Sequence, residues 1–78
     1  MWEELLQQTA DEWIRYLCTE YEIPAEDIKA VIVTEETNTN KIVEIQFFIQ
    51  NCPYIQRKHI LSDLEEKMDP ITVSVFGE

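Results

Sequence analysis

The residues of this chain that can act as nucleophiles, bases or metal ligands are few and widely spaced. They are two cysteines, Cys18 and Cys52, and one histidine, His59. Zinc sites combine closely spaced pairs of Cys and His, and no such pair occurs here. Phosphate-binding loops need several glycines, whereas Gly77 is the only glycine. A Cys52–His59 dyad lacks any recognisable nucleophile turn. We therefore expect no metal, no cofactor and no nucleophilic catalysis.

Carboxylates are the one abundant reactive group. Adjacent pairs occur at Glu26-Asp27, Glu35-Glu36 and Glu65-Glu66. General acid–base catalysis needs two carboxyl groups in contrasting environments, one of them shielded from water. Neighbouring acids in turns and on helix surfaces are both solvated, so these pairs favour a surface role. Together with the scarcity of other reactive groups, this predicts that the protein is not an enzyme.

The acids are distributed unevenly along the chain. The formal net charge is -10, with 16 acids against 6 bases. Residues 1–36 hold ten of the acids and two of the bases, and residues 37–78 hold six and four. Direct binding to nucleic acid or to an anionic membrane is disfavoured, because both need clustered Lys and Arg. The asymmetry instead suggests a negative surface that meets a basic protein.

Nothing in the sequence indicates a membrane or secreted location. No apolar run approaches the roughly 18 residues that span a bilayer. The first residues, MWEELLQQ, are acidic and amphipathic, unlike a secretory signal. We therefore expect a cytoplasmic protein whose two cysteines stay reduced, although a Cys18–Cys52 bridge is left open.

The N-terminal segment carries many of the acids on one predicted helix. Apolar residues recur at steps of three and four over residues 2–21, which predicts an amphipathic helix that Pro24 ends. On its wheel, Glu4, Asp11 and Glu22 fall within about 20° of one another, opposite the apolar stripe. If the last turn holds, they form a row about 27 Å long, diluted by Arg15.

Three further segments predict strands. Residues 28–34 are apolar on both faces, which favours a strand in the middle of a sheet. Residues 42–50 alternate, and residues 71–76 alternate again. The polar segment 35–41 between the first two is expected to turn as a hairpin. Residues 54–68 carry an apolar stripe and predict a second helix, entered through Asn51-Cys52-Pro53 with Asn51 as a cap.

This order predicts an α+β fold in a single domain, residues 1–78. We expect a two-layer sandwich with both helices on one face of a three-stranded sheet. With the most apolar strand in the centre, the strand order is 2-1-3 and the sheet is antiparallel. The connection through the second helix makes the second and third strands parallel to each other. The other face then carries mostly polar residues: Glu44, Gln46, Thr72 and Ser74, with Phe48 and Phe76 as apolar exceptions.

The predicted element order resembles half of a split β-α-β sandwich. It is also similar in outline to the ring-building modules of secretion and sporulation machines. The likeness implies the α+β architecture over most of the chain. Because one architecture serves many functions, it implies no activity.

The leading functional hypothesis is a non-enzymatic acidic protein that docks on a basic protein surface. In its sharpest form it is an inhibitor that mimics DNA and occupies the groove of a nucleic-acid-binding protein. In size and charge it is then similar to the anti-restriction and anti-CRISPR proteins of phages. The predicted partner-binding residues are Glu4, Asp11, Glu12, Glu22, Glu26, Asp27, Glu35 and Glu36.

The alternative hypothesis is a small structural or assembly module. Phe48 and Phe76 interrupt an otherwise polar sheet face, and the sheet has two unpaired edges. Such a face can pair with copies of the same chain, giving a homo-oligomer, or with a larger subunit. Phe48 and Phe76 are therefore the predicted oligomer contacts.

Overall fold

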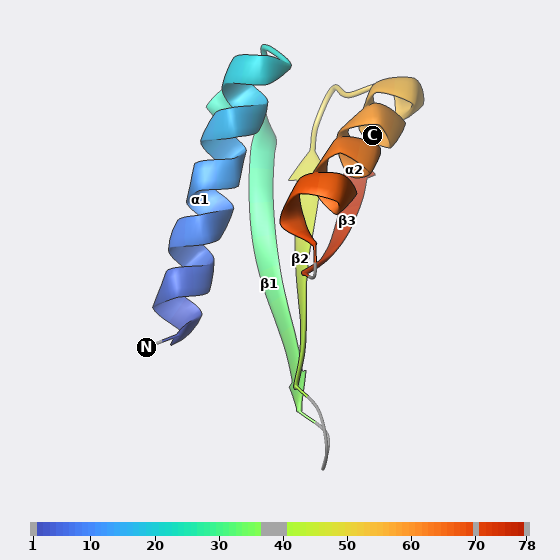
Figure 1. Ribbon diagram of the computed structural model, residues 1–78. Coiled ribbons are helices and arrows are strands. Elements are labelled where there is room, and N and C mark those ends of the chain that lie inside the picture. Colours follow the sequence, from blue (N-terminus) through green and yellow to red (C-terminus); the bar gives the residue numbers. More distant parts are fainter. Residues whose placement is uncertain (1, 37–40, 70, 78) are drawn as a thin grey trace.

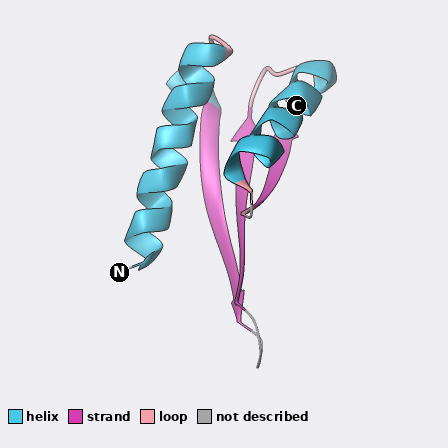
Figure 2. Cartoon of the chain, viewed as in Figure 1, coloured by secondary structure: helices cyan, strands magenta, loops and turns pink. Residues whose placement is uncertain are grey.

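The chain folds in the order helix, strand, strand, helix, strand that the sequence predicts (Figure 1). The computed structural model describes residues 2–36, 41–69 and 71–77. The elements are α1 (Trp2–Glu20), the short 3₁₀ turn η1 (Ala25–Asp27), β1 (Ile28–Glu36), β2 (Lys41–Ile49), α2 (Tyr54–Met68) and β3 (Thr72–Gly77). Of the predicted hairpin segment 35–41, residues 35, 36 and 41 belong to the strands, and residues 37–40 lie outside the described residues. Figure 2 shows the two helices beside the three strands, which confirms the α+β class.

Both helices cover the same face of the sheet. α1 contributes Ala10 and Leu17 to the core, and α2 contributes Ile60 and Leu64, all fully buried. These side chains form one cluster with the inward residues of the strands, among them Phe47 at the centre of β2. Burying apolar area in this way stabilises the fold by roughly 25 cal/mol per Å². No helix or strand of the described residues covers the second face of the sheet.

The strand order is β1-β2-β3, so the predicted order 2-1-3 is wrong. β1 and β2 pair in antiparallel fashion, as predicted, with Ile32 opposite Ile45. β2 and β3 are parallel, also as predicted, but they are direct neighbours, with Ile45 opposite Val73. The sheet is therefore mixed, and its central strand is β2.

The error has a physical cause in the composition of β1. Apolar residues on both faces of a strand normally indicate that both faces are covered. In β1, Val31 and Val33 lie on the uncovered face and remain exposed. β2, which alternates strictly over most of its length, is the central strand and pairs with β1 along one edge and with β3 along the other.

The first helix ends one residue earlier than predicted, and the second spans the predicted residues 54–68 but has a different cap. α1 ends at Glu20, with a last helical bond from the amide of Tyr21 to the carbonyl of Leu17 at 3.0 Å. Glu22 then takes a left-handed conformation, with φ of 53°. At the second helix, Pro53 rather than Asn51 is the cap, and no side chain caps the helix. Asn51 instead forms the preceding turn with φ of 57°, which Asn tolerates better than most residues.

The β1–β2 hairpin projects beyond the rest of the molecule (Figure 1). β3 pairs only with residues 44–49 of β2, so the end of the hairpin that holds Glu35 is two strands wide. The opposite end of the sheet is packed closely. A Cβ on Gly77 would lie 2.2 Å from the carbonyl oxygen of Ile49, so glycine is required there.

Candidate interaction surfaces

The uncovered face of the sheet gathers four exposed apolar side chains from three strands. They are Val31, Val33, Phe48 and Phe76, which expose 37%, 39%, 39% and 46% of their surface. Phe48 and Phe76 are register partners, and their rings stack with centroids 5.2 Å apart and planes 22° apart. The two phenylalanines predicted as oligomer contacts are thus brought together. The valines beside them come from the segment that predicts a central strand and were not among the predicted contacts.

We call this face the open face, and three of its polar residues, Glu44, Gln46 and Ser74, are bonded to one another. Glu44 lies in the middle and accepts hydrogen bonds from the hydroxyl of Ser74 and from the amide of Gln46, the latter at 3.3 Å. Both carboxylate oxygens therefore have a donor from a neighbouring side chain. A partner that covers this face need not supply new donors to Glu44.

The predicted acidic residues lie on several surfaces instead of one. Glu4 and Asp11 are exposed on α1, away from the buried Ala10 and Leu17, and Asp11 accepts a bond from Gln7 at 3.2 Å. Glu12 lies on another flank of α1. There it lines a shallow depression of about 290 Å³ with Trp13, Tyr16 and Lys67.

The remaining predicted acids lie beyond α1. Glu22 follows the helix end in its left-handed conformation, so it does not continue the predicted row on the helix wheel. Glu26 and Asp27 form the η1 turn, where Asp27 is half-buried. Glu35 alternates with Val33 and so lies on the open face, on the opposite side of the sheet from α1. Glu36 lies in β1, and its side chain is outside the part of the chain that the structure describes.

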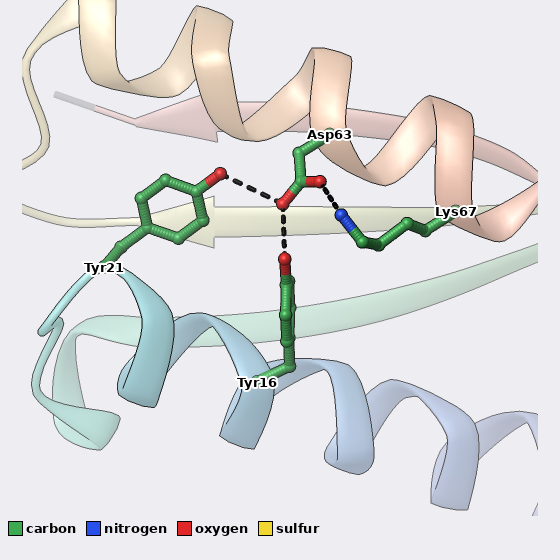
Figure 3. A network of polar contacts seen from close by, with 4 residues as sticks. All are labelled: Tyr16, Tyr21, Asp63 and Lys67. Carbon is green, nitrogen blue, oxygen red and sulfur yellow. Dashed lines mark hydrogen bonds and ion pairs between the residues drawn. The ribbon is translucent and has the colours of Figure 1, made fainter.

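A polar network that the sequence did not reveal joins the two helices (Figure 3). The Asp63 carboxylate accepts hydrogen bonds from the hydroxyls of Tyr16, at 2.7 Å, and Tyr21, at 3.0 Å. Its other oxygen pairs with Lys67, one turn later on α2. The i, i+4 spacing of Asp63 and Lys67 was visible in the sequence, but the two tyrosines come from more than forty positions away.

The network shifts the pKa values of its members in the directions that hydrogen bonding predicts. Hydrogen bonds from Lys67 and then Tyr16 hold the pKa of Asp63 below its ordinary value. Burial, followed by the bond to Asp63, raises the pKa of Tyr21 to about 12. Both shifts favour the protonation states that keep the network intact at neutral pH. The network therefore fastens α1 to α2 and needs no ligand to explain it.

The first half of α2 presents a basic and aromatic surface. Arg57 donates from Nη1 to the carbonyl of Cys52 at 2.9 Å, and its guanidinium lies 5.9 Å from the centre of the Tyr54 ring. Tyr54, Arg57 and Lys58 line a depression of about 280 Å³ that reaches Phe76 at the edge of the open face. Arg57 is thus engaged in holding the entrance to α2, whereas Tyr54 and Lys58 are exposed.

The residues with potential for nucleophilic chemistry lie on different elements, Cys18 on α1, Cys52 before α2 and His59 on α2, where His59 shares a depression with Tyr54 and Lys58. Both cysteines are free thiols, and burial raises the pKa of Cys52, which keeps its thiol protonated. His59 is exposed on α2. In the described part of the chain, no three His, Cys, Asp or Glu side chains gather as a metal site would need.

Among the helices that the structure describes, none is both long and apolar enough to cross a bilayer.

Comparison with known proteins adds no functional assignment. No protein-family model matches the chain, and no curated protein is significantly similar to it.

Proposed function

We propose that this chain is a non-enzymatic protein-binding module that assembles with a protein partner through its open face. The observation that supports the proposal is the gathering of Val31, Val33, Phe48 and Phe76 on one uncovered sheet face. An exposed apolar patch rimmed by polar residues is typical of a protein interaction site. The half-exposed Phe48–Phe76 stack provides a rigid aromatic anchor of the kind that dominates binding energy.

The edges of the open face add to this capacity for assembly. β1 and β3 each pair with β2 on one side only, so each leaves one edge without a strand among the described residues. Unpaired edges can accept a further strand. The face and its edges together offer both side-chain contacts and backbone hydrogen bonds to a partner.

We further propose that the protein works without catalysis and in the cytoplasm. Cys52 is buried with a raised pKa, and His59 lies on the solvent side of α2, so neither is prepared for nucleophilic attack. Two free cysteines suit a reducing compartment. The described depressions are shallow and shared with solvent, which suits protein contact better than enclosure of a substrate.

The proposal is tested by comparing two serine variants in the cells that produce the protein. Phe48→Ser removes half of the aromatic stack from the open face, and Ile55→Ser removes an apolar side chain from α2 that is even more exposed, at 69% against 39%. We expect Phe48→Ser to shift the chain from a complex to the monomer when the extract is chemically crosslinked before gel filtration, and Ile55→Ser to elute like the wild type. Circular dichroism checks that both variants are folded. Equal elution of all three proteins as a complex would contradict the proposal.

The acidic surface supports a second candidate function, docking on a basic protein. Glu4, Asp11, Glu22 and Glu26 are exposed, and among the side chains that the structure describes the one ion pair is Lys67–Asp63. None of these four acids is thus in an ion pair with a base among the described side chains, although Arg15 lies in the same row on α1. A nucleic-acid-binding protein whose groove the acids occupy is the sharpest form of this candidate. It ranks second because Glu35 lies on the opposite side of the sheet.

Charge reversal separates this candidate from the first. Replacing Glu4, Asp11 and Glu22 by Lys should abolish binding to a basic partner. The variant should still fold, because all three side chains are exposed. A matched control reverses three exposed acids of the C-terminal half, Glu65, Glu66 and Asp69. If the control variant loses the partner equally, net charge alone is responsible and the acidic surface of α1 has no specific role.

A further inference from the structure

The open face carries a charge pattern along β1 that is complementary to itself. Lys29, Val31, Val33 and Glu35 alternate along the strand and so form one row on this face. The row begins with a positive charge, continues with two exposed valines and ends with a negative charge. Lys29 and Glu35 are both exposed, and they lie about 20 Å apart at 3.3 Å per residue. Rotation of this row by half a turn places each charge where the opposite charge was.

We propose that the open face docks on the open face of a second copy of this chain, with Lys29 of each copy against Glu35 of the other. This deepens the proposed function and rests on it. The two-fold axis lies between the sheets, perpendicular to the strands, at the level of Ile32. Such an axis reverses the strand direction while keeping β1 over β1, and every contact occurs twice. Sheets that pack face to face in this way keep their strands within about 30° of alignment.

The same axis produces compatible contacts across the other strands. Ile32 is level with Ile45, so Gln46 of one copy lies opposite Glu44 of the other. At the centre, the side-chain amide of Gln46 in one copy thus faces the carboxylate of Glu44 in the other. Val31 of one copy faces Val33 of the other. The row that contains Phe48 and Phe76 lies opposite the row of Glu35, which belongs to the projecting hairpin of the second copy. The two-stranded end of that hairpin therefore reaches Phe48 on β2, whereas Phe76 on β3 lies beyond it.

A second copy fits the charges of this face better than a partner of one sign. A uniformly basic partner would match Glu35 and Glu44 but leave Lys29 against a like charge, and a uniformly acidic one would do the reverse. The area sets the strength of the contact. Three strands about 4.8 Å apart and about 20 Å long present roughly 300 Å² in projection. A standard stable interface buries about 800 Å² on each side, so the dimer is a weak and reversible one.

The arrangement is tested by exchanging the charges of Lys29 and Glu35 and measuring the dimer dissociation constant by sedimentation equilibrium. Lys29→Glu and Glu35→Lys each place two pairs of like charges in the dimer, and each should raise the dimer dissociation constant roughly tenfold or more. The double variant restores both pairs and should return within about threefold of the wild type. Lys58→Glu and Glu66→Lys make the same changes of charge on α2 and should leave the dissociation constant within about threefold of the wild type.

Three outcomes would overturn the inference, and two of them leave the proposed function standing. A dimer that Phe48→Ser weakens but that the double exchange does not restore still uses the open face, in a different register. A wild type that is monomeric at millimolar concentration, yet loses a different protein on Phe48→Ser, still docks through this face. If neither Phe48→Ser nor the charge variants change the dissociation constant of the dimer, both the inference and the proposed function are wrong.

Discussion

At the scale of single residues, Asp63 is the most connected polar side chain in the described structure. Two tyrosine hydroxyls from the end of α1 and Lys67 from α2 converge on its carboxylate (Figure 3). It is largely shielded, with 16% of its side chain exposed. Its role is to fix the distance between two helices that otherwise meet the sheet separately.

Asp63→Asn should therefore destabilise the protein by roughly 1 to 2 kcal/mol, because the neutral amide accepts weaker bonds and faces Lys67 without attraction. Urea unfolding followed by circular dichroism measures the change. Glu66→Gln on the same helix is the control, since it removes an exposed carboxylate and should change the free energy of unfolding by less than about 0.5 kcal/mol. Equal effects of the two substitutions would show that the network contributes nothing specific.

The contribution of Asp63 should also depend on pH in a definite direction. The pKa of Asp63 is lowered in the folded state, so its bonds stabilise the protein fully above the pKa of the unfolded chain, near 3.8. The stability difference between wild type and Asp63→Asn should be constant above about pH 5 and shrink as the pH falls below about 4. Unfolding curves at several acidic pH values test this. A difference that grows on acidification would contradict the assignment of the charged carboxylate as the acceptor.

Residue types alone predicted the open face better than they predicted the network. Alternation in β2 placed Phe48 on the polar face, and the alternation of β3 placed Phe76 there too. Their direct contact was not predicted, because the predicted order 2-1-3 separates β2 from β3. The bonds to Asp63 depend on how α1 and α2 lie against each other, which no local pattern contains. Val31 and Val33 were not predicted as contacts, because a run that is apolar on both faces was interpreted as a central strand and not as an exposed apolar patch.

At the scale of elements, the end of α1 is held in a conformation that its residue does not favour. Glu22 takes φ of 53° directly after the helix, the position where glycine is usual. A left-handed backbone costs a residue with a Cβ roughly 1 kcal/mol. The break here also explains why the predicted row of acids could not continue past Glu20.

Replacing Glu22 by Gly should therefore stabilise the protein, by roughly 0.5 to 1 kcal/mol, despite the greater freedom of glycine in the unfolded chain. Glu20→Gly removes the same charge from the last turn of α1 and should instead destabilise by up to about 1 kcal/mol. Thermal or urea unfolding of the two variants measures the contrast. Destabilisation by both substitutions would mean that the strain at Glu22 is not significant.

The sheet shows where prediction from sequence succeeds and where it stops. The strand segments, the second helix and the parallel relation of β2 and β3 followed from periodicity and from the length of the crossover. The neighbour of β3 did not, because β1 and β2 present similar inward faces and local patterns do not decide which one β3 joins. The crossover through α2 brings β3 back directly beside β2, so no strand is skipped between them.

At the scale of the whole molecule, the excess of acids acts against folding. The chain carries a net charge of -10, and among the described side chains one ion pair is present. Like charges at this density repel one another and destabilise the compact state. Because the acids lie on several surfaces, this repulsion is spread over the molecule.

Salt should therefore stabilise the monomer. Raising the ionic strength from about 0.01 M to about 0.15 M shortens the screening length from about 30 Å to about 8 Å. We expect the free energy of unfolding, measured at low protein concentration, to rise over this range in wild type and in Asp63→Asn alike. A decrease would indicate that specific ion pairs outweigh the general repulsion.

The central claim, that the open face is the surface through which this protein meets its partner, is tested most directly by photocrosslinking. A benzoylphenylalanine is placed in turn at Phe48 on the open face, at Asp11 on α1 and at Glu66 on α2, in cells that produce the protein. The account predicts protein adducts from the Phe48 position, including one of twice the chain's mass, and little from the other two. Adducts from the Asp11 position with none from Phe48 would contradict this claim and would show that the acidic surface of α1 binds the partner.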